Sequence, residues 1–187
     1  MPTNKRTGLV VGPAQSRGTS MLEILITILI LSVGMLGLAA LQGKAHTSEL
    51  ESYQRGQALI LLQDINSRME GNMSNAASYV TAGAGTGATD AADCTGLGTR
   101  AAIDLCEWSK ALKGSSETQG GSTQGAMING RGCVAATGTN VYLLSVVWQG
   151  LGATAAPATA CGQNLYDSEA TRRAVTMTFR VPDLSGS

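Results

Sequence analysis

One carboxylate lies inside a long apolar run near the N-terminus of this chain. Glu23 follows Gly18 and Thr19 by a few residues and is itself followed by the uncharged stretch 24–41. A carboxylate placed in hydrocarbon costs about 2.5–3.5 kcal/mol even on lenient insertion scales. We therefore expect Glu23 to be paired with a positive charge in its working environment, and the search for that partner leads to the function.

The apolar run is long enough to cross a membrane. About 20 apolar residues span a bilayer, and the stretch 19–41 is interrupted only by Glu23. A secretory signal peptide usually has a shorter core, of about 7–15 residues. Residues 1–18 contain three basic residues and no acid. The positive-inside rule places them in the cytoplasm and the remainder of the chain outside it.

The charge balance excludes some classes of function. Residues 19–187 hold ten of the 13 basic residues and all 13 acidic residues, a net charge of −3. Because this part is acidic, we expect no direct nucleic-acid binding. The only histidine is His46, and no Ser/His/Asp set, metal-ligand spacing or carboxylate pair stands out. We expect neither enzymatic activity nor a cofactor or metal site.

Four cysteines follow the apolar run. Their spacing fits no zinc motif, and an even number outside the cytoplasm indicates two disulfides. Three pairings are possible. We favour Cys94–Cys106 and Cys133–Cys161 because each closes a local unit, with free buried thiols as the alternative. A disulfide contributes about 2–4 kcal/mol, a large share for a core with only 4% aromatic residues.

The elements that position these residues can be read from hydrophobic periodicity. One helix is expected from about residue 20 to 70, apolar all round at first and amphipathic later. A short helix is expected over 100–113, with Thr99 as its N-cap and Gly114 at its end. The side of the long helix that faces the core is predicted to carry Leu50, Tyr53, Ala58, Leu61, Ile65, Met69 and Met73.

The C-terminal third is predicted to form strands. They are expected at 132–136, 140–149 and 174–181, with Gly-rich loops over 81–98 and 114–125. The spacing of Trp108 and Trp148 is typical of core residues. The expected fold is α+β, a long N-terminal helix packed on a small antiparallel sheet. The domains are residues 1–18 as a cytoplasmic leader, 19–42 as the transmembrane half of the helix, 43–72 as its amphipathic half, and 73–187 as a globular head.

The N-terminal residues resemble those of the type IV pilin-like superfamily. The matching signature is Gly18, then Thr19-Ser20-Met21-Leu22-Glu23, then about 18 apolar residues. The resemblance implies that a prepilin peptidase cleaves between Gly18 and Thr19 and that Glu23 sets the register of assembly. It also implies N-methylation of Thr19, which stands where the family usually has Phe.

A second resemblance covers more of the chain. Residues 31–42, 104–108, 131–134 and 142–148 are similar to a minor pilin of the PilV type. This implies a subunit of the inner membrane with a periplasmic head, which later joins a cell-surface pilus (fimbrium). Its implied partners are other minor pilins, the major pilin and a pilus-tip adhesin. The implied role is priming and assembly of the type IV pilus, in support of twitching motility, adhesion or DNA uptake.

Two other functions stay open at the level of sequence. A minor pseudopilin of a type II secretion system would share the same N-terminus. A membrane-anchored adhesin or binding module could use the Gly-rich loops to present a ligand site.

Overall fold

A computed structural model describes residues 20–115, 118–119, 122–123 and 127–183. The first element is helix α1 (Met21–Glu70), which is followed by the 3-10 helix η1 (Met73–Tyr79) and by strand β1 (Thr81–Gly85). The α+β class and the long apolar N-terminal helix are as predicted.

Helix α1 begins at a polar residue and ends beside a glycine. The Ser20 carbonyl accepts the first helical hydrogen bonds, from the amides of Glu23 and Ile24 at 2.9 and 3.3 Å. No proline interrupts the following 50 residues, so the series of backbone hydrogen bonds along the helix is not broken by a missing N–H donor. Gly71 closes the last turn by donating to the Ser67 carbonyl at 3.0 Å.

The sheet is antiparallel throughout, in the order β1-β4-β5-β6. Strands β4 (Arg131–Gly138) and β5 (Val141–Gln149) form a hairpin whose turn contains Asn140 with a positive φ of 57°. Strand β6 (Arg172–Arg180) pairs with β5 over its whole length and follows the 3-10 helix η2 (Glu169–Thr171). Strands β2 (Thr118–Gln119) and β3 (Ser122–Thr123) form a separate two-stranded ribbon.

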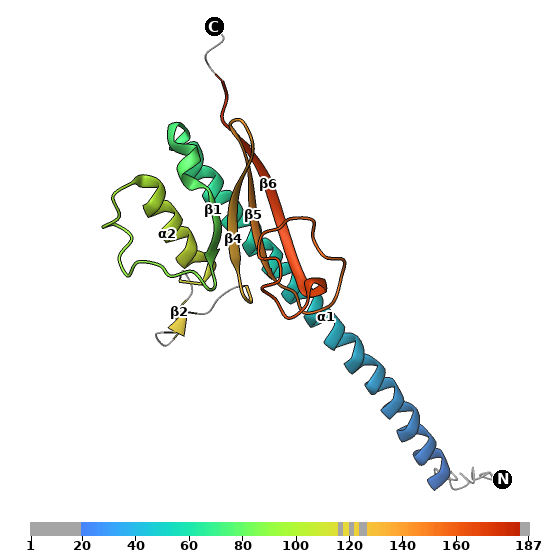
Figure 1. The fold of residues 1–187 in the computed structure, drawn as a ribbon. Helices are drawn as coiled ribbons and strands as arrows, with labels where there is room; N and C mark the ends of the chain where they lie inside the picture. Colours follow the sequence, from blue (N-terminus) through green and yellow to red (C-terminus); the bar gives the residue numbers. More distant parts are fainter. Residues whose placement is uncertain (1–19, 116–117, 120–121, 124–126, 184–187) are drawn as a thin grey trace, which may run out of the picture. The chain divides into compact units, whose positions relative to one another are not determined.

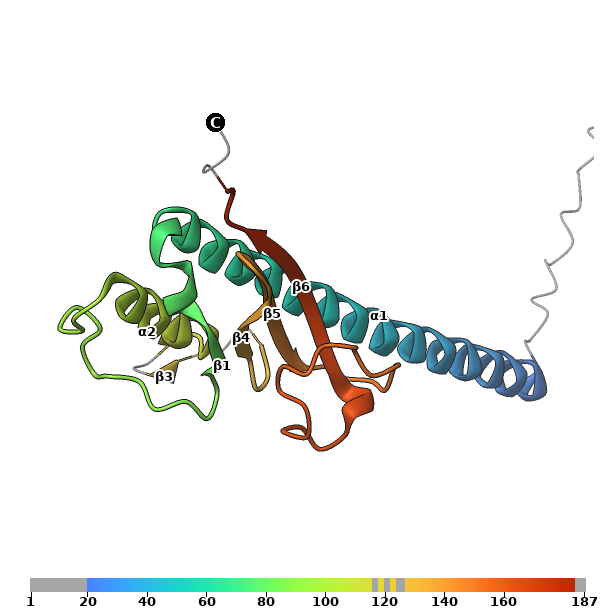
Figure 2. The same cartoon turned by 45° about the horizontal axis from the view of Figure 1, so that its top comes forward.

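The second half of α1 covers one face of this sheet (Figures 1 and 2). Alternate strand residues point to opposite faces, and those turned toward the helix include Val134, Leu144 and Val146, all fully buried. The helix meets them with Gln54, Ala58, Leu62, Ile65 and Met69. The predicted face of the helix is wrong in part, because Leu50, Tyr53 and Met73 are 41–54% exposed.

Helix α2 (Arg100–Leu112) lies beside β1 in both views (Figures 1 and 2). The Thr99 hydroxyl accepts the Ala102 amide at 3.2 Å, which confirms the predicted cap. Trp108 is fully buried and donates its indole N–H to the Leu61 carbonyl of α1 at 2.8 Å. Its six-membered ring contacts Gly132 of β4, and a side chain there would collide with it.

Two stretches predicted as loops contain strands. Residues 81–85 form β1, whose small side chains give little β-propensity. The strand exists because it pairs with β4 and because the Gly85 amide donates to the Ser109 hydroxyl of α2 at 2.7 Å. Gly85 also has a positive φ of 87°, which favours glycine. The second stretch, 114–125, contains the ribbon β2–β3.

Candidate functional site

The first half of α1 presents an exposed apolar surface. All described side chains from residue 20 to 50 are exposed; Leu25, Leu29 and Leu36, for example, are 64–71% exposed. This helix is long and apolar enough to cross a membrane. A large exposed apolar surface marks a membrane or protein contact.

Glu23 lies in the first turn of this apolar segment. The two hydroxyls that follow it are satisfied within the helix, since Thr27 donates to the Ile24 carbonyl at 2.8 Å and Ser32 to the Ile28 carbonyl at 2.7 Å. Among the described residues, none pairs with the Glu23 carboxylate. Glu23 is therefore the single ionisable group of residues 20–43 and is available to a partner outside them.

The predicted processing site, Gly18 and Thr19, lies outside the described residues. Cleavage there and methylation of Thr19 stay predictions, as does the role of Glu23.

Apolar side chains are also exposed on the part of α1 that carries the head. Tyr53 and Ile60 are 49% and 59% exposed and lie two turns apart on the side opposite Ala58 and Ile65, which are fully buried. This helix thus has one face on the sheet and another that carries uncovered apolar side chains.

A buried polar network holds the far end of α1 to α2 and η1. The Asp104 carboxylate, fully buried, accepts the Tyr79 hydroxyl at 2.5 Å and is paired with Arg68 and Arg100 at 3.1 and 2.9 Å. Burial and the bond to Asp104 raise the pKa of the Tyr79 phenol. Burial acts against the Arg68 charge, but hydrogen bonds to Glu107 and Asp64 outweigh it and raise the Arg68 pKa. Sequence reasoning missed this network because its contacts join residues up to 39 positions apart.

A second buried charge, Arg172, orders the loop before β6. Its side chain is 2% exposed and donates to the Thr159 and Cys161 carbonyls at 2.8 and 3.1 Å. Glu169 accepts from its Nε at 2.7 Å. This bond, together with the Asn164 amide, lowers the pKa of Glu169. Arg172 therefore has a structural role.

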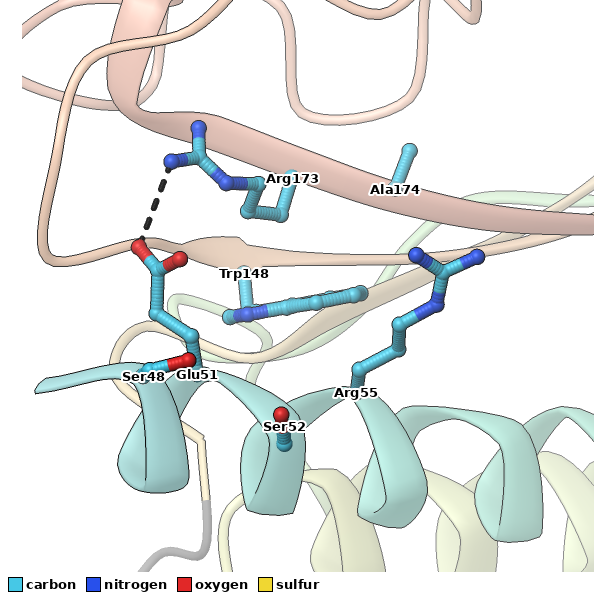
Figure 3. Close-up of a pocket in the computed structure, with 7 residues that line it drawn as sticks. All are labelled: Ser48, Glu51, Ser52, Arg55, Trp148, Arg173 and Ala174. Atoms are coloured by element: carbon cyan, nitrogen blue, oxygen red, sulfur yellow. Dashed lines mark hydrogen bonds and ion pairs between the residues drawn. The ribbon is translucent and has the colours of Figure 1, made fainter. Parts of the chain in front are cut away.

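A small polar pocket of about 260 Å³ lies where α1 meets β5 and β6 (Figure 3). Trp148 lines it and is 3% exposed, so the prediction that this residue belongs to the core is confirmed. Glu51 and Arg173 face each other across one end of the pocket at 3.3 Å, and Arg55 lies at the other end (Figure 3).

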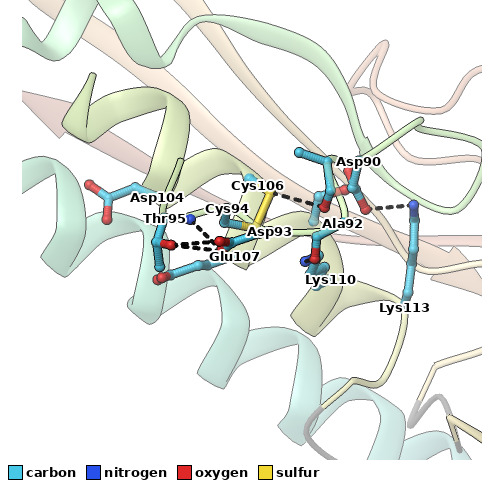
Figure 4. Close-up of a disulfide and its surroundings, with 12 residues drawn as sticks. Asp90, Ala92, Asp93, Cys94, Thr95, Asp104, Cys106, Glu107, Lys110 and Lys113 are labelled. Atoms are coloured by element: carbon cyan, nitrogen blue, oxygen red, sulfur yellow. Dashed lines mark hydrogen bonds and ion pairs between the residues drawn. A yellow bond between two sulfur atoms is a disulfide. The ribbon is translucent and has the colours of Figure 1, made fainter. Parts of the chain in front are cut away.

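The cysteines form two disulfides, Cys94–Cys106 and Cys133–Cys161, the pairs favoured from the sequence. The first joins the loop before α2 to α2 itself (Figure 4), with Cα atoms 5.6 Å apart. The second joins β4 to the loop that Arg172 orders, on the sheet face away from α1. Both distances between Cα atoms, 5.6 and 5.8 Å, lie in the usual range.

Among the described residues, no group of three or more His, Cys, Asp or Glu side chains could hold a metal ion. The expectations of no metal, no cofactor and no catalysis stay predictions.

Comparison with models of known protein families, with curated proteins and with solved structures found no match. The class that the structure itself defines is an α+β protein in which one long helix provides an exposed apolar segment and then packs on a four-stranded antiparallel sheet.

Proposed function

We propose that this chain is a minor pilin, a structural subunit that helps to prime and assemble a type IV pilus. One observation carries the proposal: the exposed apolar segment of α1 holds a single carboxylate, Glu23, in its first turn. An ordinary membrane anchor has no need of that charge, and its cost in hydrocarbon requires compensation. The small α+β head on the same helix supports the proposal.

The chemistry of assembly follows from the position of Glu23. Cleavage between Gly18 and Thr19 would create an α-amino group with a reference pKa of about 8, hence mostly protonated at neutral pH. If neighbouring helices are staggered along the filament, the Glu23 carboxylate of one subunit meets the Thr19 amine of the next. In a low-dielectric surrounding, a paired carboxylate is tolerated and an unpaired one is costly, so one register is selected.

The rest of the interface is supplied by the apolar side chains of α1. Before assembly they are covered by lipid, and afterwards by the helices of neighbouring subunits. The exposed Tyr53 and Ile60 extend the same contact surface into the head. The proposed partners are other minor pilins, the major pilin and a tip adhesin.

Substitution of Glu23 tests this function. In the native host, we expect Glu23→Ala to be cleaved normally but to be depleted at least tenfold from sheared pili. Glu49→Ala is the matched control, because Glu49 is an exposed carboxylate on the same helix that lies 3.5 Å from His46. Mass spectrometry of a peptide that starts at Thr19 reports cleavage, and immunoblotting of sheared pili reports incorporation. Equal incorporation of Glu23→Ala and the control would refute the proposal.

Deletion of the gene separates a pilus from a secretion role. Loss of surface pili and twitching with normal protein secretion is expected. Loss of secretion with intact pili would assign the chain to a type II secretion pseudopilus instead.

A further inference from the structure

The pocket between α1, β5 and β6 contains polar groups that the fold does not use. It is lined by Ser48, Glu51, Ser52, Arg55, Trp148, Arg173 and Ala174. The protein satisfies some of these groups and leaves others facing the cavity. The unused groups indicate what the pocket binds.

Glu51 and Arg173 are largely occupied by the head itself. One Glu51 carboxylate oxygen accepts from the amides of Leu151 and Gly152 and from Arg173, at 3.2–3.3 Å. Arg173 also donates to the Thr154 hydroxyl and to the Gly152 carbonyl, both at 2.7 Å. These two residues fasten the loop after β5 to α1, and their charges compensate each other.

Trp148 and Arg55 are the donors that remain. The Trp148 side chain is almost entirely buried, yet its indole N–H donates to none of the described residues. By contrast, the N–H of the other tryptophan, Trp108, is bonded to a carbonyl at 2.8 Å. The Arg55 guanidinium likewise has no carboxylate partner in the described part of the chain. Neither donor belongs to the buried unpaired atoms of the described residues, so both are open to the cavity, where a bound acceptor can reach them.

The two donors lie at opposite ends of one aromatic ring. In Figure 3 the indole nitrogen lies toward Glu51, and the Arg55 guanidinium lies beyond the other end of the ring. A single carboxylate cannot reach both ends of an indole, whereas an extended peptide can present a main-chain carbonyl to one and an acidic side chain to the other. The cavity of about 260 Å³ is also smaller than the pockets of about 300–1,000 Å³ that hold drug-sized ligands.

The net charge of the pocket predicts the charge of its ligand. Two guanidinium groups and one carboxylate line the pocket, which leaves one positive charge in excess, on Arg55. Ser48 and Ser52 add neutral hydroxyls that can donate to an acceptor.

We propose that this pocket binds an acidic peptide segment of a neighbouring pilus subunit, with its carboxylate on Arg55 and a backbone carbonyl on the Trp148 N–H. The identity of the partner rests on the proposed function. Ser52 and Arg55 are exposed on α1 where they line the pocket, so a neighbour that packs along this side of the helix would meet both. The pocket thus adds a specificity contact in the head to the register contact at Glu23.

The binding chemistry can be tested on the full chain in detergent micelles. With ¹⁵N-labelled tryptophan, the two indole N–H signals are followed by NMR and assigned with Trp148→Phe. The probe is the blocked peptide acetyl-Gly-Glu-Gly-amide, and its Gln counterpart is the control ligand. We expect the Glu peptide to shift the Trp148 signal saturably and to leave the Trp108 signal in place. Arg55→Gln should weaken this binding on the order of fivefold, as expected for an exposed ion pair.

Arg180→Gln is the matched control variant, because Arg180 is an exposed arginine on β6 that does not line this pocket. It should bind as the wild type does. The proposal is overturned if the Trp148 signal does not move, if the Gln peptide or acetate shifts it equally, or if Arg55→Gln binds unchanged.

The partner is tested in the native host. A photo-reactive phenylalanine at Ser52 should crosslink to an acidic segment of another pilus subunit, identified by mass spectrometry of the adduct. Arg55→Glu should abolish the crosslink, and exchange of the crosslinked acid for lysine should restore it. A crosslink that Arg55→Glu leaves unchanged overturns the proposal. Normal piliation after gene deletion, together with an intact NMR response, would instead refute the minor-pilin function and leave the acidic-peptide site standing.

Discussion

Substitution of Gly132 by alanine should destabilise the head strongly. A Cβ atom at this position would collide with the Trp108 ring and lie 2.7 Å from both its Cζ2 and Cζ3 atoms. Trp108 cannot move away easily, because it is fully buried and its indole N–H is held by the Leu61 carbonyl at 2.8 Å. Overpacking costs about 1–3 kcal/mol, and we expect the upper end, near 3 kcal/mol. For a chain of this size, that lowers the Tm by about 6–12 °C.

Gly138→Ala is the control on the same strand. Its Cβ would lie 3.8 Å from the nearest atom, Cβ of Val141, an ordinary van der Waals contact, so its stability should stay within about 0.5 kcal/mol of wild type. Thermal unfolding of the full chain in detergent, followed by near-UV circular dichroism, measures both. A Tm for Gly132→Ala equal to that of Gly138→Ala would show that Trp108 does not pack on β4 as described.

Three further outcomes are expected from the head. Asp104→Asn should lower the stability by about 2–4 kcal/mol because it removes the buried carboxylate that pairs with Arg68 and Arg100 and accepts the Tyr79 hydroxyl, whereas Glu107→Gln, at a 41% exposed side chain, should cost less than about 1 kcal/mol; thermal unfolding compares them. Burial raises the pKa of Tyr166 to about 12, above its unfolded value of about 10. The folded state therefore holds this proton more tightly, and stability should fall as the pH rises through that interval, less so in Tyr166→Phe. Double serine substitution of Cys133 and Cys161 should cost about 3.6 kcal/mol, against about 2.8 kcal/mol for Cys94 and Cys106, because the closed loops span 28 and 12 residues; chemical unfolding of each variant ranks the two.

The regular elements could be predicted where one local rule decides the structure. Helix α1 follows from its long apolar run without proline and from the apolar periodicity beyond it, and β5 follows from its β-branched and aromatic residues. Thr99 caps the N-terminus of α2, as expected for a threonine at that position. Strand β1 was missed because its sequence, Thr-Ala-Gly-Ala-Gly, has no such signal and depends on its pairing with β4.

The face of α1 was harder to predict than the helix itself. Apolar residues occur on both sides of its second half, so periodicity alone does not show which side meets the sheet. The buried position of Gln54 and the exposed position of Tyr53 both contradict a simple apolar-inside rule, and an uncovered apolar side is what a second contact surface requires. The long-range contacts of Asp104 and the unpaired indole N–H of Trp148 depend on tertiary placement. No sequence pattern predicts them.

The two disulfides have a mechanical consequence. Both lie between residues 94 and 161, so neither joins α1 to the sheet. Apart from the backbone that continues from the end of α1 through η1 to β1, a tensile load that enters the head through α1 is carried to the sheet by noncovalent contacts of the described residues, chiefly those of Leu62, Ile65 and Met69. Under sufficient force the helix would peel from the sheet first, while the segments of 12 and 28 residues between the cysteines could not lengthen. The head would then open between α1 and the sheet while most of its strands stay paired. The helix could pack on the sheet again when the tension falls.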